Sequence, residues 1–416
     1  TVDKKTVIKG GVGNIKYYSD NNNYRLAISD ITVGNNEFFT QPIKIDSVTT
    51  DFSYNKNDDS WAISTENACI KFGGVAVLPQ LNMQVVGNHI KELKLYSTLS
   101  DPAINKLFIL LPDKKLSSPL CEWLKKSLVN GYIENITAEF LNNKLSWFLT
   151  FKDTELKYSQ DWPSIDKIDA VLSMVDGNLS INATKAYVLG NSVRSLGVTY
   201  SEYKNAKYGI VNVFGNIDST LESGLSFIKK SPLQKTIGAE LETFNPSGAM
   251  SLDLALKINL IDIDTPVKIA AQIELKNDML YAPELDLSLS NINGKLLITN
   301  DLLRSENLRL HLLGKPATAL VVMEDFKNPS LKMSIKSIVD VVDLHKIFPV
   351  FELDHVSGKA NIMASIDIPL HDNKTNKLFT LSSDLVGVKI NLPAPFNKSA
   401  DSKMPLQVLY NMTDIS

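Results

Sequence analysis

The chain has 416 residues, of which 44% are apolar and 21% charged, fractions that are typical of a folded, water-facing protein and exclude gross disorder. Its 43 basic and 46 acidic residues give a formal net charge of −3 and form no basic stripe, which argues against a nucleic-acid partner. The two cysteines, Cys69 and Cys121, exclude a disulfide scaffold and a clustered zinc site, while one disulfide between them stays open as an alternative.

The first hundred residues are polar and rich in asparagine, and they give weak strand signals. Short alternating runs at Tyr24–Ile28 and Ser60–Ser64 predict strands there. The glycine cluster Gly10–Gly13 has no helix after it, which a phosphate-binding loop requires, so we predict a turn.

The clearest helix signal begins at Ser118, a suitable N-cap, with Pro119 at the first helical position, and extends to about Gly131. The apolar residues of this predicted helix share one face: Leu120, Trp123, Leu124 and Leu128. Two interpretations stay open, namely a helix packed on a sheet and a helix that caps or gates a hydrophobic groove.

Two shorter helices are predicted further along the chain. One extends from Ser223 to about Lys230, before a proline, and the other follows Asp340 and ends at Pro349. Helices are therefore expected to be few.

Period-two alternation dominates the rest of the chain, and residues 250–260 carry apolar side chains at all six even positions. Such a strand has one apolar and one polar face, because successive side chains point to opposite sides. The alternation recurs in five more runs: Leu285/Leu287/Leu289, Leu308/Leu310/Leu312, Leu331/Met333/Ile335, Ile362/Ala364/Ile366/Ile368 and Val388/Ile390/Leu392.

Turn signals separate these runs and predict short connections between antiparallel strands. The four clearest are Asp176-Gly177-Asn178, Asn245-Pro246-Ser247-Gly248, Asn293-Gly294 and Asn328-Pro329. The apolar faces of the strands have two interpretations. They form the closed core of a sandwich or barrel, or they line an open trough for acyl chains, and periodicity alone does not choose between the two.

The sequence shows no catalytic constellation, so we predict that the chain is not an enzyme and holds no cofactor or metal. The neighbouring pairs Asp343/His345 and Asp354/His355 are of a kind that occurs by chance, and no nucleophile elbow, phosphate loop or zinc-binding helix motif is present. The longest apolar stretches are far below the roughly 18 residues of a membrane-spanning helix. Because the chain begins at Thr1 and ends in a polar run, we expect it to be part of a longer protein.

Several short segments within roughly residues 110–400 carry recognisable motifs, namely Ser118–Leu124 with Gly131–Asn135, Leu156–Pro163, Ser231–Leu233, Asn245–Gly248 and Ser383–Phe396. In their order along the chain, these segments resemble motifs of the YhdP branch of the AsmA-like family. The resemblance implies a mainly β fold, in which a long, twisted antiparallel sheet with a few short helices curls into an elongated open groove. Residues 1–110 would be the N-terminal part of this groove and 111–416 the family-like segment.

The resemblance also implies a function. Members of this family are anchored in the inner membrane of Gram-negative bacteria, project through the periplasm and are implicated in moving phospholipid to the outer membrane. We therefore expect a periplasmic segment whose partners are phospholipid, the two membranes through parts outside this chain, and periplasmic proteins. The expected wall of the groove comprises Leu252, Leu254, Leu256, Ile258, Leu285, Leu287, Leu308, Leu310, Ile362, Ile366, Val388 and Ile390.

Two other functions stay open. A periplasmic scaffold would bind a protein partner along its sheet edge and carry no lipid. An all-β hydrolase or carbohydrate-binding protein would need clustered carboxylates or an exposed aromatic row. Only Tyr17, Tyr18 and Tyr24 are candidates for such a row.

Overall fold

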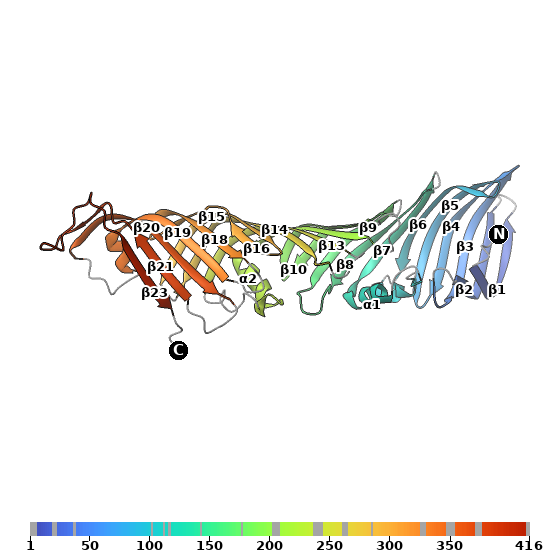
Figure 1. Ribbon diagram of the computed structural model, residues 1–416. Coiled ribbons are helices and arrows are strands. Elements are labelled where there is room, and N and C mark those ends of the chain that lie inside the picture. The colour runs from blue at the N-terminus through green and yellow to red at the C-terminus, as the bar shows by residue number, and fades with distance from the viewer. Residues whose placement is uncertain are drawn as a thin grey trace.

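The computed structural model describes residues 6–18, 23–35, 39–100, 103–110, 113–114, 118–141, 144–175, 178–201, 209–235, 244–259, 265–283, 286–324, 330–346, 354–370 and 377–412. Within these ranges, 23 strands form one long, twisted antiparallel sheet with few helices. The strands follow one another along the long axis of the molecule, from the N-terminal end to the C-terminal end (Figure 1). The predicted mainly β, elongated fold is thus confirmed.

The strands of the N-terminal half are long. They are β1 (Thr6–Tyr18), β2 (Asn23–Asn35), β3 (Ile43–Asn57), β4 (Ser60–Phe72), β5 (Val75–Val86), β6 (His89–Ser100), β7 (Leu128–Leu141), β8 (Lys144–Leu156), β9 (Ile165–Val175), β10 (Asn178–Val188), β11 (Asn191–Ser201) and β12 (Ile210–Thr220). The pairing of β6 with β7 makes the sheet continuous across residue 110. A domain division at that residue stays a prediction.

The C-terminal half contains both long and short strands. They are β13 (Asn245–Asn259), β14 (Lys268–Ala282), β15 (Leu287–Thr299), β16 (Leu302–Ser305), β17 (Leu308–Leu312), β18 (Lys315–Glu324), β19 (Ser330–Asp340), β20 (Val356–Pro369), β21 (Lys377–Ser383), β22 (Val388–Ile390) and β23 (Leu406–Met412).

Almost every strand pairs with the next one in the chain, as expected for antiparallel strands joined by short connections. Two places depart from this order. The short strands β16 and β17 together occupy the place of one strand between β15 and β18. Near the C-terminus, β21 pairs with β23, while β22 pairs with the beginning of β20.

The described helices gather at one long edge of the sheet. They are the 3₁₀ helix η1 (Ile104–Leu110), α1 (Ser118–Ser127), α2 (Leu221–Lys229) and the 3₁₀ helix η4 (Val341–Lys346). In an antiparallel sheet, successive connections alternate between the two edges. The segments after β6, after β12 and after β19 therefore reach the same edge, because β16 and β17 count as one strand. Figure 1 shows α1 and α2 along that edge.

The predicted helix bounds need correction. The first helix ends at Ser127 and Leu128 already begins β7, so the prediction that Leu128 belongs to the helix is wrong. The second helix starts earlier than predicted because Thr220 is its N-cap, with Oγ1 accepting a hydrogen bond from the Ser223 N–H (3.2 Å). The third is a 3₁₀ helix to Lys346, and the rest of that prediction lies outside the described residues.

Three predicted turns are wrong, because the glycines concerned lie inside strands. Gly10 and Gly11 have positive φ within β1, Gly248 (φ 131°) lies in β13, and Gly294 (φ 142°) lies in β15. Register shifts beside Gly248 and Gly294 show that these residues form β-bulges. The other two turn signals include residues 176–177 and 328–329, which lie outside the described residues.

Candidate functional site

The apolar face of the sheet is continuous across many strands. From β7 to β14, one residue of each strand lies directly across from an apolar residue of the next. The row consists of Ile136, Leu149, Leu172, Ile181, Val198, Val213, Leu256 and Ile269. At a strand spacing of about 4.8 Å, seven steps make an unbroken apolar path on the order of 34 Å long.

The opposite face of the same strands is mixed, with polar rows beside exposed apolar residues such as Val171 and Phe214. A parallel row across β9–β14 contains Ser173, Ser180, Thr199, Asn212, Lys257 and Lys268. Hydrogen bonds connect its members, such as the pair of Oγ atoms of Ser173 and Ser180 at 2.7 Å. Only the first face carries a continuous apolar row across all eight strands, and this apolar face is the candidate site.

The sheet also curls over its apolar face. Phe244, which immediately precedes β13, packs against a cluster that includes Met323 and Ile368. Met323 belongs to the same cross-strand row as Leu254, through Ala271, Ile298 and Leu303. In a flat sheet Phe244 would be about 33 Å from that row, because ten positions of an extended strand separate it from Leu254. The contact thus requires a concave apolar face, which is a groove.

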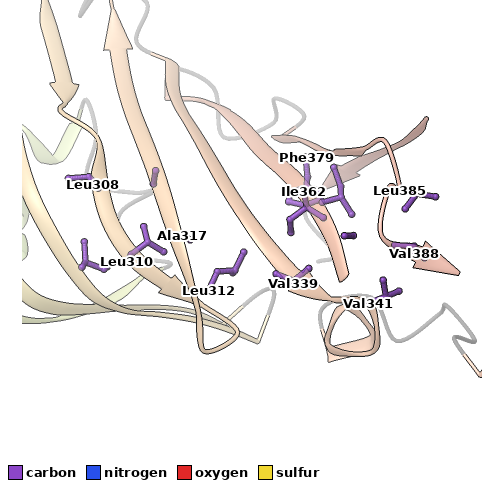
Figure 2. Packing of buried hydrophobic residues seen from close by; sticks show 14 of the residues in the cluster. Leu308, Leu310, Leu312, Ala317, Val339, Val341, Ile362, Phe379, Leu385 and Val388 are labelled. Carbon is purple, nitrogen blue, oxygen red and sulfur yellow. The ribbon is translucent and has the colours of Figure 1, made fainter. Parts of the chain in front are cut away.

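The groove is open in one part and filled in another. The apolar residues of β13 that face it are half-buried, whereas Leu308, Ile362 and Val388 are only 5%, 3% and 1% exposed. Figure 2 shows how the filling arises, since side chains of β17–β21 and of the segment with Leu385 and Val388 project toward one another. The C-terminal part is therefore packed by the protein's own side chains.

A single lysine holds residues 385–399, the closing segment that carries Leu385 and Val388. Nζ of Lys398, a residue only 7% exposed, donates hydrogen bonds to the carbonyl oxygens of Leu385 (2.8 Å), Val388 (2.9 Å) and Ser399 (3.0 Å). Both Leu385 and Val388 belong to the filled core. Lys398 thereby ties the closing segment to itself, and sequence reasoning missed this role because a lysine is ordinarily exposed.

The predicted wall residues fall into three groups. Seven are half-buried, namely Leu252, Leu254, Leu256, Ile258, Leu287, Ile366 and Ile390. Leu308, Leu310, Ile362 and Val388 are buried in the filled part, and Leu285 lies outside the described residues. Their role in binding a ligand stays a prediction. Of the half-buried group, Leu252, Leu254, Leu256 and Ile258 lie in the open part of the groove on β13, whereas Leu287 and Ile366 pack against buried clusters.

The predicted capping helix lies at the edge of the sheet. Trp123 is 41% exposed and its Nε1–H donates a hydrogen bond to the Tyr158 carbonyl (3.1 Å), while Leu124 is half-buried. Leu128 packs from β7 on the cluster beneath η1, and the side chain of Leu120 lies outside the described residues. Whether α1 gates the groove stays a prediction.

The 3₁₀ helix η1 also covers part of the apolar face, which the sequence did not predict. Ile104 and Leu107 of η1 are buried against Phe72, Val75 and Ile133, where the apolar face meets the helix-bearing edge. The signal was present in the sequence as the apolar stretch near Leu107, but seven residues without clear periodicity do not predict a 3₁₀ helix.

One carboxylate is buried near this edge. Asp278 is fully buried; its Oδ2 accepts a hydrogen bond from the Lys276 N–H (2.9 Å), and its Oδ1 has no partner among the described residues. Desolvation by burial raises the pKa of its carboxyl. Gly248 leaves the space that this side chain occupies, so Asp278 is part of the β-bulge packing.

The described residues show no cluster of three or more potential metal ligands. Cys69 and Cys121 are both free thiols, and Asp354 and His355 are exposed. Among the described helices, none has the length and apolar character needed to span a membrane.

A known protein family matches nearly the whole chain. The family model described as YhdP protein matches residues 10–415. The chain belongs to the YhdP protein family. A curated relative, the "Intermembrane phospholipid transporter YhdP" of Escherichia coli (strain K12), is 20% identical over 391 residues, or 89% of this chain. The match covers 30% of that protein, so the chain spans about a third of its relative's length. No solved structure matches.

Proposed function

We propose that this YhdP-family segment carries phospholipids along its apolar groove, as part of a route between the inner and outer membranes of a Gram-negative bacterium. The observation that carries the proposal is the unbroken row of apolar residues over eight strands on a concave, half-open face. The name of the E. coli relative, a phospholipid transporter between membranes, supports the same ligand.

The energetics explain why a continuous groove is useful. Each buried methylene is worth about 0.8 kcal/mol, so two chains of about 16 carbons hold a phospholipid in its membrane by roughly 25 kcal/mol. At such a barrier, unaided escape into water takes on the order of days. The groove keeps the acyl chains out of water along the path, while the polar headgroup stays in solvent at the open side. The residues of the wall therefore solvate the chains and perform no covalent step.

The location follows from the same proposal. The segment would lie in the periplasm and reach the two membranes through parts of the protein outside this chain. The half-buried residues of β12–β14 would contact the acyl chains, and the filled part near β20–β22 would not do so without a rearrangement of the closing segment.

A scaffold function is the second candidate, and one observation favours it. Strand β1 pairs on one side with β2, and among the described residues its other edge pairs with no strand. The apolar side chains of β1 are strongly exposed, with Val12 at 78% and Ile15 at 61%. Such an edge can receive a further strand, from a partner protein or from another part of the same protein.

The test that separates the two functions is mass spectrometry of lipid extracted from the purified segment, with an unrelated water-soluble protein purified from the same cells as the control. Phospholipid at one or more molecules per chain, absent from the control, is the expected result. A folded segment that carries no more phospholipid than the control would contradict the proposal and favour the scaffold.

A further inference from the structure

A second hollow lies on the opposite, polar face of the sheet. Its volume is about 780 Å³ and it is lined by residues of β15, β17, β18, β19 and β20. Arg309, Thr318, Lys336 and Ile338 line it and are exposed, whereas their neighbours Leu310 and Ala317 have their side chains buried on the groove side. The hollow is thus separated from the groove by the thickness of the sheet.

A β-bulge shapes this hollow. Asn291 of β15 adopts a left-handed conformation (φ 53°), and the register between β15 and β17 shifts between Ser290 and Asn293. The side chain of Asn293 is held on two sides, because its Oδ1 accepts from the Asn277 N–H (3.1 Å) and its Nδ2 donates to the Asn291 carbonyl (2.8 Å). One wall of the hollow is therefore fixed by these hydrogen bonds. β-Bulges are common beside active sites.

The cationic side chains of the hollow belong to one cross-strand row. Arg309 lies directly across from Thr318, and Thr318 directly across from Lys336, so two strand spacings of about 4.8 Å separate the two cationic residues. His311 and Asn361 line the hollow beside this row. A threonine hydroxyl thus lies between a guanidinium and an ammonium group.

No carboxylate neutralises these cations within the described part of the chain. All lining residues are neutral or basic, and neither Arg309 nor Lys336 forms an ion pair there. Asp340, two positions after Ile338 on the same face, is bound to Lys315 Nζ at 2.6 Å. In a chain with a net charge of only −3, this carboxylate-free hollow is locally electropositive.

We infer that the hollow on the polar face binds a phosphate group, with Arg309 and Lys336 as its two cationic contacts and Thr318 as a hydroxyl donor between them. The planar guanidinium matches two phosphate oxygens at once, and charge-assisted hydrogen bonds of this kind are the strong ones. Ile338, 60% exposed beside the row, offers an apolar contact to the organic part of a phosphate ester. The ligand class is a phosphate mono- or diester, either free in solution or as the headgroup of an anionic phospholipid.

The test uses the intact segment and two charge-matched double variants. One is Arg309→Gln/Lys336→Gln, and the control is Lys257→Gln/Lys268→Gln, which removes two cations that face each other on the same polar face outside the hollow. Circular dichroism establishes that all three proteins are folded. Calorimetric titration with glycerol phosphate measures the free source, and flotation with phosphatidylglycerol vesicles, compared with phosphatidylcholine vesicles, measures the lipid source.

The expected result is saturable binding of at least one probe by the wild type and the control, weakened roughly tenfold or more in the hollow variant, because the loss of even one charge-assisted contact of about 1.4 kcal/mol is a tenfold loss of affinity. Binding of glycerol phosphate identifies a free phosphate ester as a ligand, and binding of anionic vesicles alone identifies a headgroup. The inference is overturned if the wild type binds neither probe, or if the hollow variant binds as tightly as the control.

Discussion

Leu254 of β13 lies directly across from Ala271 of β14 and from Gly215 of β12, and these small neighbours leave its side chain half-buried in the groove. The next residue, Ala255, projects from the opposite face and is exposed. Positions 254 and 255 therefore lie on opposite faces of the same strand.

A charge at position 254 should weaken lipid retention in the groove. In Leu254→Asp, a carboxylate faces the acyl chains, and burying an unpaired charge costs several kcal/mol. We expect the amount of phospholipid that co-purifies with the segment to fall several-fold, measured by mass spectrometry. The matched variant Ala255→Asp adds the same charge on the polar face and should retain lipid as the wild type does. Equal retention by both variants would show that this position does not line the lipid path.

The packing of Gly248 against Asp278 should make β13 intolerant of any side chain at the bulge. A Cβ at position 248 would overlap the Asp278 carboxylate, and the φ of 131° is a glycine conformation. Gly248→Ala should lower the free energy of unfolding by about 2 kcal/mol or more, measured by urea denaturation. Gly190→Ala, also at positive φ but with nothing within 4 Å of the added Cβ, should cost only about 1 kcal/mol. Equal losses would mean that the contact with Asp278 is not the cause.

The buried carboxyl of Asp278 should give the segment a recognisable pH dependence. Its pKa is raised in the folded state, so the folded protein binds this proton more tightly than the unfolded chain does. The contribution is stabilising below the ordinary value of 3.8 and is lost as the pH rises through the raised pKa. Asp278→Asn should therefore gain stability relative to the wild type as the pH increases over that window.

Asp340 supplies the control of opposite sign for the same measurement. Its pKa is lowered by the hydrogen bond from Lys315, so its contribution is present above 3.8 and is lost as the pH falls. Asp340→Asn should lose stability relative to the wild type as the pH increases. Parallel urea denaturation curves of both variants at several pH values check the two signs, and a pH-independent difference for Asp278→Asn would contradict the burial effect.

Lys398 should hold the closing segment in place. Lys398→Met keeps most of the length of the side chain but removes the ammonium group and its three carbonyl contacts. We expect faster amide hydrogen exchange at Val388–Ile390 and a loss of roughly 2 kcal/mol in unfolding free energy. Lys389→Met, at an exposed position of the same strand, should change neither. Unchanged exchange in Lys398→Met would show that the segment is held by packing alone.

The alternation of residues 250–260 predicted β13 and its two faces, because strand periodicity depends only on adjacent residues. The glycine signals were harder to interpret. Asn293-Gly294 has the chemistry of a hairpin turn, yet it lies in the bulge of β15, and a left-handed glycine serves both structures.

The long-range features could not be derived from the sequence. The contact of Phe244 with Met323 depends on the curl of a sheet over several strands, which no local pattern encodes. For the same reason Val388, which alternates like a groove strand, was assigned to the wall, although it lies buried in the closing segment. The overall fold could be predicted from the family resemblance. The row of apolar residues along the groove could be found only from the register of the paired strands.

The central claim is that acyl chains lie against the apolar face and not against the polar one. Site-specific photo-crosslinking tests it directly, with p-benzoylphenylalanine replacing Leu256 in one protein and Lys257 in another, expressed in cells and analysed by mass spectrometry after irradiation. Phospholipid adducts at position 256 and their absence at position 257 are the predicted result. Adducts at neither position, or equally at both, in folded proteins would contradict a lipid-conducting groove.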